Sequence, residues 1–114
     1  MFTIYHNNRC SKSRQTLSLL EQHAITPTII DYLNTPPSAE TIQSLLLKLG
    51  LGVRDIMRNG EAAYKTLGLA DNTLSDQALI DAIVTHPKLL QRPIVVKGDK
   101  AIIGRPPENV LELI

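Results

Sequence analysis

The 114-residue chain contains a single cysteine, no tryptophan and no long apolar run. One cysteine cannot form an internal disulfide, so a redox cycle at this residue needs a thiol from another molecule. No stretch approaches the roughly 18 apolar residues of a membrane span, and the N-terminus lacks the apolar core of a signal peptide. These absences predict a cytoplasmic protein with no membrane partner, in which the thiol stays reduced.

An excess of charge of either sign is also absent. The chain has 12 Lys and Arg residues against 11 Asp and Glu residues, which gives a formal net charge of +1. This balance argues against a nucleic-acid partner and leaves room for a local anion pocket. Hydrophobic residues make up 43% of the chain and charged residues 20%, as in globular rather than disordered proteins. We therefore expect one folded domain over residues 1–114.

The beginning of the chain alternates between strand and helix patterns. Residues 2–5 and 28–32 are rich in β-branched and aromatic side chains and predict strands. Between them, Leu17, Leu20 and Ala24 stand at helical spacing and predict a helix over residues 11–23. Because a helix connects the two strands, we expect the strands to be parallel.

Helical patterns fill the middle of the chain. One helix is expected between TPPS at 35–38, which supplies a capping serine, and Gly50, which ends it. Shorter helices are expected over VRDIMR and residues 61–67, and Ser75 predicts the cap of a further helix. This helical segment, at about residues 36–72, is interpreted as an insertion rather than as a separate domain.

Strands return near the end of the chain. Residues 93–96 and 101–103 flank KGDK, which suits a tight hairpin. A last α-helix follows, with Val110, Leu111 and Ile114 as its expected inner face. The order of elements predicts an α/β, thioredoxin-like three-layer fold, which is a mixed four-stranded sheet enlarged by the inserted helices.

Cys10 lies at the turn between the first predicted strand and the first predicted helix. Backbone N–H groups and the helix dipole stabilise an anion at such a turn, which favours the reactive thiolate. Polar residues follow the thiol, and the cations Arg9, Lys12 and Arg14 flank it. The alternative is a small buried residue without chemistry, the usual state of a lone cysteine. The polar neighbours favour a reactive thiol.

Two polar residues near Cys10 each have a functional and a structural interpretation. Ser13 occupies the place of the second cysteine in a C-x-x-C redox motif. Its hydroxyl either donates a hydrogen bond to the thiolate, which lowers the thiol pKa, or caps the first turn of the helix. His6 either acts as a cation or proton acceptor near the thiol, or makes an ordinary hydrogen bond at the end of the strand.

Arg92 precedes Pro93 at the start of a strand, and Arg58 and Arg105 follow apolar positions elsewhere. In a thioredoxin-like layout a cis-proline at position 93 packs beside the active cysteine and brings Arg92 next to Cys10. The alternative is an ordinary trans proline. Three arginines around one thiolate form a pocket for a phosphate-like oxyanion, because the planar guanidinium binds such ions well. Otherwise Arg58 and Arg105 are solvated surface residues.

Motifs over essentially the whole chain carry a family resemblance: IYHNNRCSKSRQTL, TIIDYLNTPP, GVRDIMR, YKTLGLAD, LIDAIVTHPKLLQRPIVV and GRPPENVLEL. The chain resembles the glutaredoxin-coupled arsenate reductases, the ArsC-like branch of the thioredoxin-like superfamily, and is most similar to its short members. By position, the resemblance identifies Cys10 as the nucleophile, His6 as the histidine that activates the thiol and Pro93 as the cis-proline. The family's substrate-binding arginines match Arg58, Arg92 and Arg105.

The resemblance implies an oxidoreductase, a glutaredoxin-dependent arsenate reductase, with no bound cofactor and no metal. Arsenate is held by the arginines and the first helix, the Cys10 thiolate attacks arsenic, and water leaves. Glutathione then adds as co-substrate and arsenic becomes trivalent. Glutaredoxin, the protein partner, resolves the resulting disulfide. The single cysteine fits this scheme because glutathione replaces a second protein thiol.

Three alternatives stay open. One is that the same fold acts on a physiological substrate other than arsenate, since a pocket for arsenate also suits other oxyanions. A glutathione-dependent thiol transferase needs Cys10 but not the three arginines. A redox-responsive regulator that binds RNA polymerase belongs to a related branch, whose members usually carry C-x-x-C, and Ser13 does not fit that motif. The arginines and the serine together favour arsenate reductase.

Overall fold

The computed structural model describes all 114 residues. The chain divides into two compact units, one made of Met1–Thr35 with Arg92–Ile114 and the other of Pro36–Gln91. The first unit contains the sheet and Cys10, and the second is built from helices. None of the helices is both long and apolar enough to cross a membrane. The expectation of one domain over the whole chain stays a prediction.

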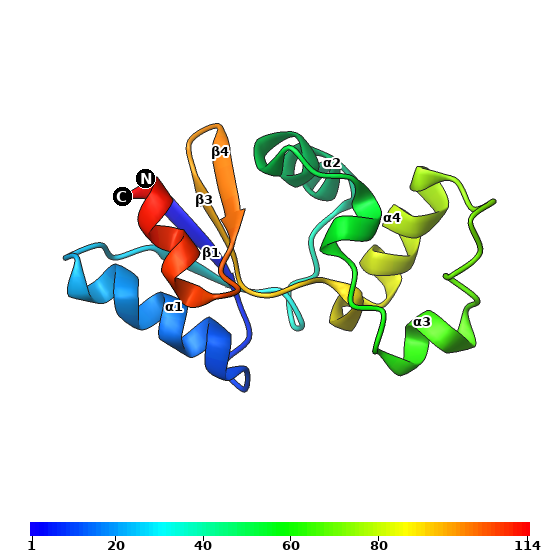
Figure 1. Cartoon of the computed structure of the whole chain (residues 1–114), viewed down its shortest axis with the longest axis horizontal. Helices are drawn as coiled ribbons and strands as arrows, with labels where there is room; N and C mark the ends of the chain where they lie inside the picture. The colour runs from blue at the N-terminus through cyan, green and yellow to red at the C-terminus, as the bar shows by residue number, and fades with distance from the viewer. The chain divides into compact units, whose positions relative to one another are not determined.

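A mixed four-stranded sheet forms the framework of the first unit (Figure 1). Its strands lie in the order β2-β1-β3-β4. β1 and β2 are parallel, whereas β3 is antiparallel to both β1 and β4. The predicted fold, with its parallel pair, its hairpin and its helical insertion, is therefore confirmed. The bounds of the strands are Phe2–His6 for β1, Thr28–Asp31 for β2, Ile94–Lys97 for β3 and Lys100–Ile103 for β4.

Helix α1 (Ser11–Gln22) buries a face that differs in part from the predicted one. Leu20 is fully buried as expected, but Leu17 is only half-buried. Ala24 lies beyond the end of the helix, is exposed and has a φ of 60°. The other buried residues of α1 are hydroxyl-bearing, Ser13 and Thr16. The spacing of apolar residues did not predict this face, because the buried side chains of Ser13 and Thr16 form hydrogen bonds rather than hydrophobic contacts.

The C-terminal helix is a 3-10 helix, η3 (Pro107–Leu113), and not the expected α-helix. With three residues per turn, Val110 and Leu113 share its buried face. Leu111 and Ile114 were expected to face inward, but they are 43% and 46% exposed. Val110 and Leu113 join the hydrophobic cluster of α1, β1 and β3, so η3 and α1 lie beside each other on one face of the sheet (Figure 1).

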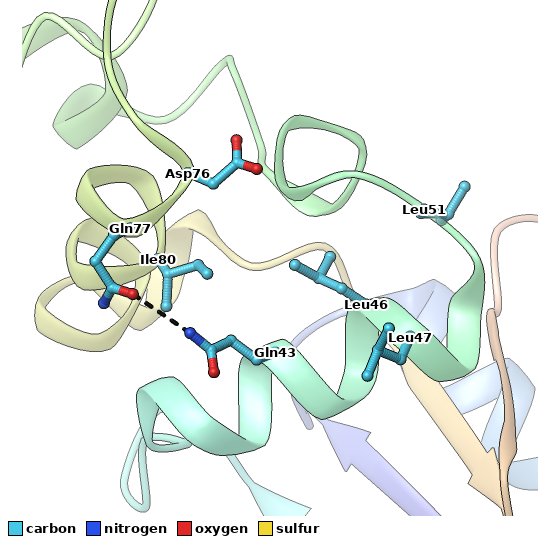
Figure 2. Close-up of a pocket in the computed structure, with 7 residues that line it drawn as sticks. All are labelled: Gln43, Leu46, Leu47, Leu51, Asp76, Gln77 and Ile80. Atoms are coloured by element: carbon cyan, nitrogen blue, oxygen red, sulfur yellow. Dashed lines mark hydrogen bonds between the residues drawn. The ribbon is translucent and has the colours of Figure 1, made fainter.

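The second unit contains α2 (Ala39–Leu49), η1 (Val53–Ile56), α3 (Ala62–Thr66), α4 (Asp76–Thr85) and η2 (Pro87–Leu89). Its two longer helices are capped by serines. Ser38 and Ser75 each accept a hydrogen bond at 3.1 Å from the backbone N–H three residues further on. Both caps confirm the sequence prediction. α2 and α4 pack against each other, and Gln43 Nε2 donates to Gln77 Oε1 at 3.3 Å (Figure 2).

Arg54 in η1 connects distant segments of the second unit. Its guanidinium donates to the backbone carbonyls of Leu69 and Asp71, both at 2.7 Å, and to the Tyr64 hydroxyl at 3.2 Å. Hydrogen bonds from a charged donor are stronger than neutral ones. Arg54 therefore has a structural role, which separates it from Arg58, the other arginine of VRDIMR.

Candidate active site

Cys10 occupies the N-cap position of α1, directly after the turn that follows β1. Its N–H donates to the carbonyl of Asn7 at 3.0 Å and closes the turn, and its carbonyl accepts from the N–H of Arg14 at 3.0 Å. An N-cap side chain is positioned to accept hydrogen bonds from the second and third N–H groups of a helix, here those of Lys12 and Ser13. The sulfur thus stands where a capping oxygen usually lies, at the positive end of the helix dipole.

The surroundings of the thiol lower its pKa. Burial alone raises the pKa of Cys10, because the protein solvates a thiolate less well than water does. The N–H groups of Ser13 and Lys12 and the guanidinium of Arg92 outweigh burial and hold the pKa below its ordinary value. The site favours the nucleophilic form.

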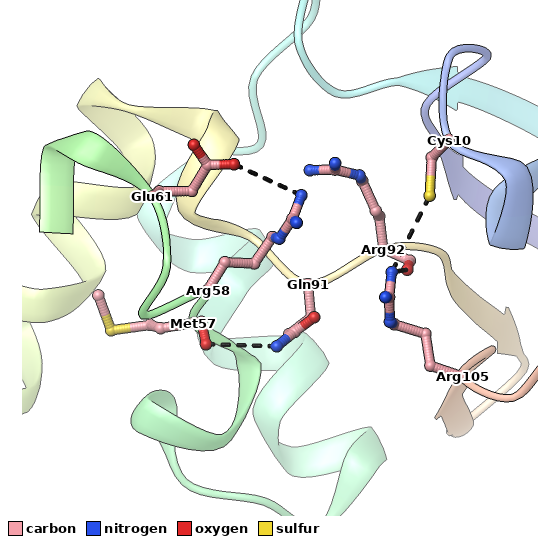
Figure 3. Close-up of polar contacts among 7 residues, drawn as sticks. All are labelled: Cys10, Met57, Arg58, Glu61, Gln91, Arg92 and Arg105. Carbon is pink, nitrogen blue, oxygen red and sulfur yellow. Dashed lines mark hydrogen bonds and ion pairs between the residues drawn. The ribbon is translucent and has the colours of Figure 1, made fainter.

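Two arginines of the first unit approach the sulfur. The Nη1 atom of Arg105 lies 3.9 Å from Cys10 Sγ and donates to the backbone carbonyl of Arg92 at 3.3 Å (Figure 3). Arg105 thus contacts the sulfur, and the guanidinium of Arg92 lowers the thiol pKa. The fold brings both residues to Cys10 from the far end of the sequence. Their binding of a substrate stays a prediction.

Close packing fixes the backbone next to these two arginines. The Arg92–Pro93 peptide bond is cis, as expected from the thioredoxin-like layout. The N–H of Gly104 donates to the Pro93 carbonyl at 2.9 Å. A Cβ atom on Gly104 would lie 2.6 Å from Thr16 Oγ1 and 2.8 Å from Pro93 Cγ. Only glycine fits here without displacing the side chain of Thr16 or the proline ring.

A buried hydrogen-bond network joins the end of β1 to α1. The Ser13 hydroxyl lies 2.6 Å from Nδ1 of His6 and accepts from the N–H of Asn7 at 3.0 Å. Ser13 is fully buried and His6 is 6% exposed. The hydrogen bond joins the Ser13 hydroxyl to Nδ1 of His6 and leaves Nε2 outside this network. The Ser13 hydroxyl therefore pairs with His6, and it is the Ser13 N–H that acts on the thiol.

Positive charge without carboxylate partners surrounds Cys10. Arg9, Lys12 and Arg14 are exposed and form no salt bridge. Arg14 uses one nitrogen to donate to the carbonyl of Asn8 at 2.9 Å. Cations that lack acidic partners keep their attraction for an anion from solution.

Arg58 belongs to the second unit, at the end of the VRDIMR segment. Its N–H donates to the carbonyl of Leu89 at 2.7 Å, and its Nη1 atom forms an ion pair with Glu61 Oε1 at 3.5 Å (Figure 3). This Nη1 atom is buried and makes no hydrogen bond besides the ion pair. Its contact with a substrate stays a prediction.

Asn7 and Tyr32 were not singled out from the sequence, although both follow strands at the edge where Cys10 lies. Besides bonding Ser13, Asn7 accepts the N–H of Arg9 through Oδ1 at 3.0 Å and shapes the turn. Because asparagine is common in turns, its position directly after a strand could have identified Asn7 as part of the turn. Tyr32 is fully buried, and nothing in its strand-like sequence context sets it apart.

The groove between α2 and α4 lacks the chemistry found at Cys10. It has one carboxylate, that of Asp76, and no nucleophile (Figure 2). The structure also contains no group of three or more His, Cys, Asp or Glu side chains that could hold a metal ion. The lining residues of the groove are Gln43, Leu46, Leu47, Leu51, Asp76, Gln77 and Ile80.

Comparisons with known proteins identify relatives that match nearly the whole chain. The model of the ArsC family matches residues 5–113. The arsenate reductase of Haemophilus influenzae is 51% identical over 112 residues, which cover 97% of each chain. YfgD of Escherichia coli K12, described as uncharacterised, is 54% identical over 112 residues, which cover 97% of this chain and 94% of YfgD. The solved structure of an arsenate reductase from Vibrio cholerae has a TM-score of 0.97 at 54% identity and covers 99% of this chain and 97% of that one.

Proposed function

This chain belongs to the ArsC family, as its motifs predicted, and we propose that it is an arsenate reductase. The observation that carries the proposal is the Cys10 thiol, which has a lowered pKa at the N-terminus of α1 and lies 3.9 Å from Arg105. A thiolate among N–H groups and cations is suited to attack the central atom of a bound oxyanion. The names of the Haemophilus and Vibrio relatives support arsenate as that oxyanion.

In the proposed complex, arsenate binds above the sulfur between the N-terminus of α1 and the arginines. Arg92 and Arg105 hold its oxygens, and Arg58 is the third substrate-binding arginine. Guanidinium groups suit this role because their planar N–H forks match the edges of a tetrahedral oxyanion. The cations at positions 9, 12 and 14 attract the anion to the site.

The first chemical step joins sulfur to arsenic. The Cys10 thiolate attacks arsenic, one As–O bond breaks, and the leaving oxygen takes up two protons in total to depart as water. Arsenic stays pentavalent in the resulting thiol adduct, so no electrons have yet been transferred. We assign His6 to proton exchange at this stage, because Ser13 holds its ring through Nδ1 and leaves Nε2 free.

The second step reduces arsenic with an external thiol. The thiolate of glutathione attacks the Cys10 sulfur, the S–As bond breaks, and its electron pair stays on arsenic, which leaves as trivalent arsenite. Two thiols are oxidised to one disulfide while arsenic gains two electrons, so the step balances. Glutaredoxin then reduces the mixed disulfide and restores Cys10. An external thiol is required because the chain has no second cysteine.

A coupled assay tests the proposal. Purified protein is mixed with glutathione, glutaredoxin, glutathione reductase and NADPH, and NADPH oxidation is followed with and without arsenate. We expect arsenate-dependent oxidation, and replacing the glutaredoxin system by thioredoxin and its reductase should abolish it. Activity with thioredoxin alone would overturn the glutathione route but keep the reductase. Disulfide reduction without any response to arsenate would overturn the proposal in favour of a thiol transferase.

A further inference from the structure

Tyr32 carries a buried hydroxyl that makes no well-formed hydrogen bond. Its side chain is fully buried, and its hydroxyl has no hydrogen bond. A buried polar group without a hydrogen bond lowers stability, whereas a phenylalanine at the same place would bury the same ring without this cost. Such exceptions are rare in folded proteins and often mark functional positions.

The sheet places Tyr32 at the edge that carries Cys10. In the parallel pair of β1 and β2, His6 lies opposite Asp31. The next residues, Asn7 and Tyr32, therefore leave the sheet side by side at the carboxyl ends of the two strands. The Asn7 carbonyl accepts the N–H of Cys10 at 3.0 Å, so the turn that carries the thiol begins at this point. Ligands of open α/β sheets commonly bind outside the carboxyl ends of parallel strands.

Arg92 contributes a second donor without a partner. Its Nε atom is buried and has no hydrogen bond. Burial raises the pKa of Tyr32, while the charge of Arg92 and hydrogen bonding from the side chains of Asn7 and Arg92 lower it. Both side chains therefore lie near the phenol, although neither makes a well-formed hydrogen bond with its hydroxyl. A raised pKa keeps the phenol protonated at neutral pH, so its O–H is a donor.

We infer that Tyr32 is a further substrate-binding residue, whose hydroxyl donates a hydrogen bond to an oxygen of the oxyanion held between Cys10 and Arg92. Buried, preorganised donors aimed at one anion are what an oxyanion site requires. The O–H bond of Tyr32 stays intact, so the residue orients the tetrahedral ion over the sulfur and transfers no proton. The inference rests on the proposed function in one respect, which is that an oxyanion binds at the thiol. It does not require that the oxyanion is reduced.

Protection of Cys10 from alkylation tests this contact without turnover. The rate of reaction with iodoacetamide is measured against increasing arsenate, and separately against phosphate, in the absence of glutathione. Tyr32→Phe removes the hydroxyl and keeps the ring. We expect the anion concentration for half-protection to rise about tenfold or more, as for the loss of one hydrogen bond to a charged group.

Tyr5→Phe is the matched control. Tyr5 is 8% exposed in the same unit, and burial alone raises its pKa, so no charged group of the site acts on it. Protection in this variant should equal that of the wild type. Equal protection in Tyr32→Phe, or no protection of the wild type by either anion, would overturn the inference. Hydroxyl-dependent protection in a protein that does not reduce arsenate would overturn the proposed function and leave the inference standing.

Thermal unfolding separates binding from a structural role. Without anion, Tyr32→Phe should be as stable as the wild type or more so, because it loses an unpaired buried hydroxyl. With phosphate, its Tm should rise less than that of the wild type. A lower Tm without anion and an unchanged rise with phosphate would contradict the inference. If the variant fails to fold, the ultraviolet absorbance of the tyrosines in the wild type is compared with and without phosphate. The contact predicts a difference spectrum, and no spectral change would contradict it.

Discussion

The Ser13 hydroxyl lies 2.6 Å from Nδ1 of His6, inside the fold and not against the thiol. In a dithiol redox motif this position carries the second cysteine. Here it carries a fully buried serine that also accepts the N–H of Asn7 at 3.0 Å. The residue therefore organises the turn that presents Cys10, and resolution of a Cys10 disulfide is left to an outside thiol.

Removal of the Ser13 hydroxyl should destabilise the protein. Ser13→Ala leaves buried polar groups of His6 and Asn7 without a partner, and we expect a loss of about 1–3 kcal/mol in the free energy of unfolding. Urea unfolding measures it. Ser11→Ala is the control, because Ser11 is exposed at the first position of α1, and a change within about 0.5 kcal/mol is expected. Equal losses in the two variants would contradict the role of the network.

The lowered pKa of Cys10 predicts a specific pH dependence. The thiolate is the form that iodoacetamide alkylates, so the rate should fall as the pH drops through the Cys10 pKa, with a midpoint below that of an ordinary cysteine. Arg92→Gln removes a charge that stabilises the thiolate, and the midpoint should move upward. Arg105→Gln should also move the midpoint upward, because it removes a guanidinium that lies 3.9 Å from the sulfur. An unchanged midpoint in both variants would contradict stabilisation of the thiolate by the arginines.

Gly104 should tolerate no side chain. In Gly104→Ala the new Cβ atom would lie 2.6 Å from Thr16 Oγ1 and 2.8 Å from Pro93 Cγ. Relief of these overlaps displaces the Thr16 side chain or the proline ring, and overpacking of this kind costs about 1–3 kcal/mol. Gly60→Ala is the control, since nothing lies within 4 Å of a Cβ atom there. Denaturation curves of the two variants should differ clearly, and coinciding curves would contradict the close packing.

Substitution of the two arginines of VRDIMR should affect different properties, the stability of the protein for Arg54 and the binding of substrate for Arg58. Arg54→Gln loses hydrogen bonds to the carbonyls of Leu69 and Asp71, and a loss of about 2 kcal/mol in stability is expected. Arg58→Gln loses a partly exposed ion pair with Glu61, which contributes about 0–1 kcal/mol. Its effect should instead be a rise of roughly tenfold in the KM for arsenate. An unchanged KM in Arg58→Gln would remove this residue from the substrate-binding set.

Much of the first unit could be predicted because local chemistry and fold agree there. The run before Cys10, the helix after it and the TIIDY strand each have a clear period, and a helical connection makes the strands parallel. Serines at helix starts likewise identify their caps directly. The C-terminal segment could not be predicted in the same way, because an α-helical and a 3-10 period differ by less than one residue per turn over so short a stretch.

The candidate site was predictable only for residues whose chemistry is evident from their type and context. Cys10 stands out as the lone thiol, and the arginines stand out through family motifs. The partner of the Ser13 hydroxyl was not predictable, since one oxygen has several polar neighbours and only packing selects His6. Tyr32 was hidden for a similar reason: at the end of a strand, a tyrosine has the same pattern as a core residue, and only its unpaired hydroxyl distinguishes it.

The most direct test of the account is a single-turnover experiment without glutaredoxin. Wild-type protein and Cys10→Ser are incubated with arsenate and glutathione, arsenite is quantified, and the protein mass is measured and mapped to the modified residue. Because Cys10 and glutathione each supply one oxidised thiol, we predict one arsenite per glutathione-modified Cys10, and neither product in Cys10→Ser. Arsenite formation by Cys10→Ser, or by wild-type protein whose Cys10 stays unmodified, would contradict the account.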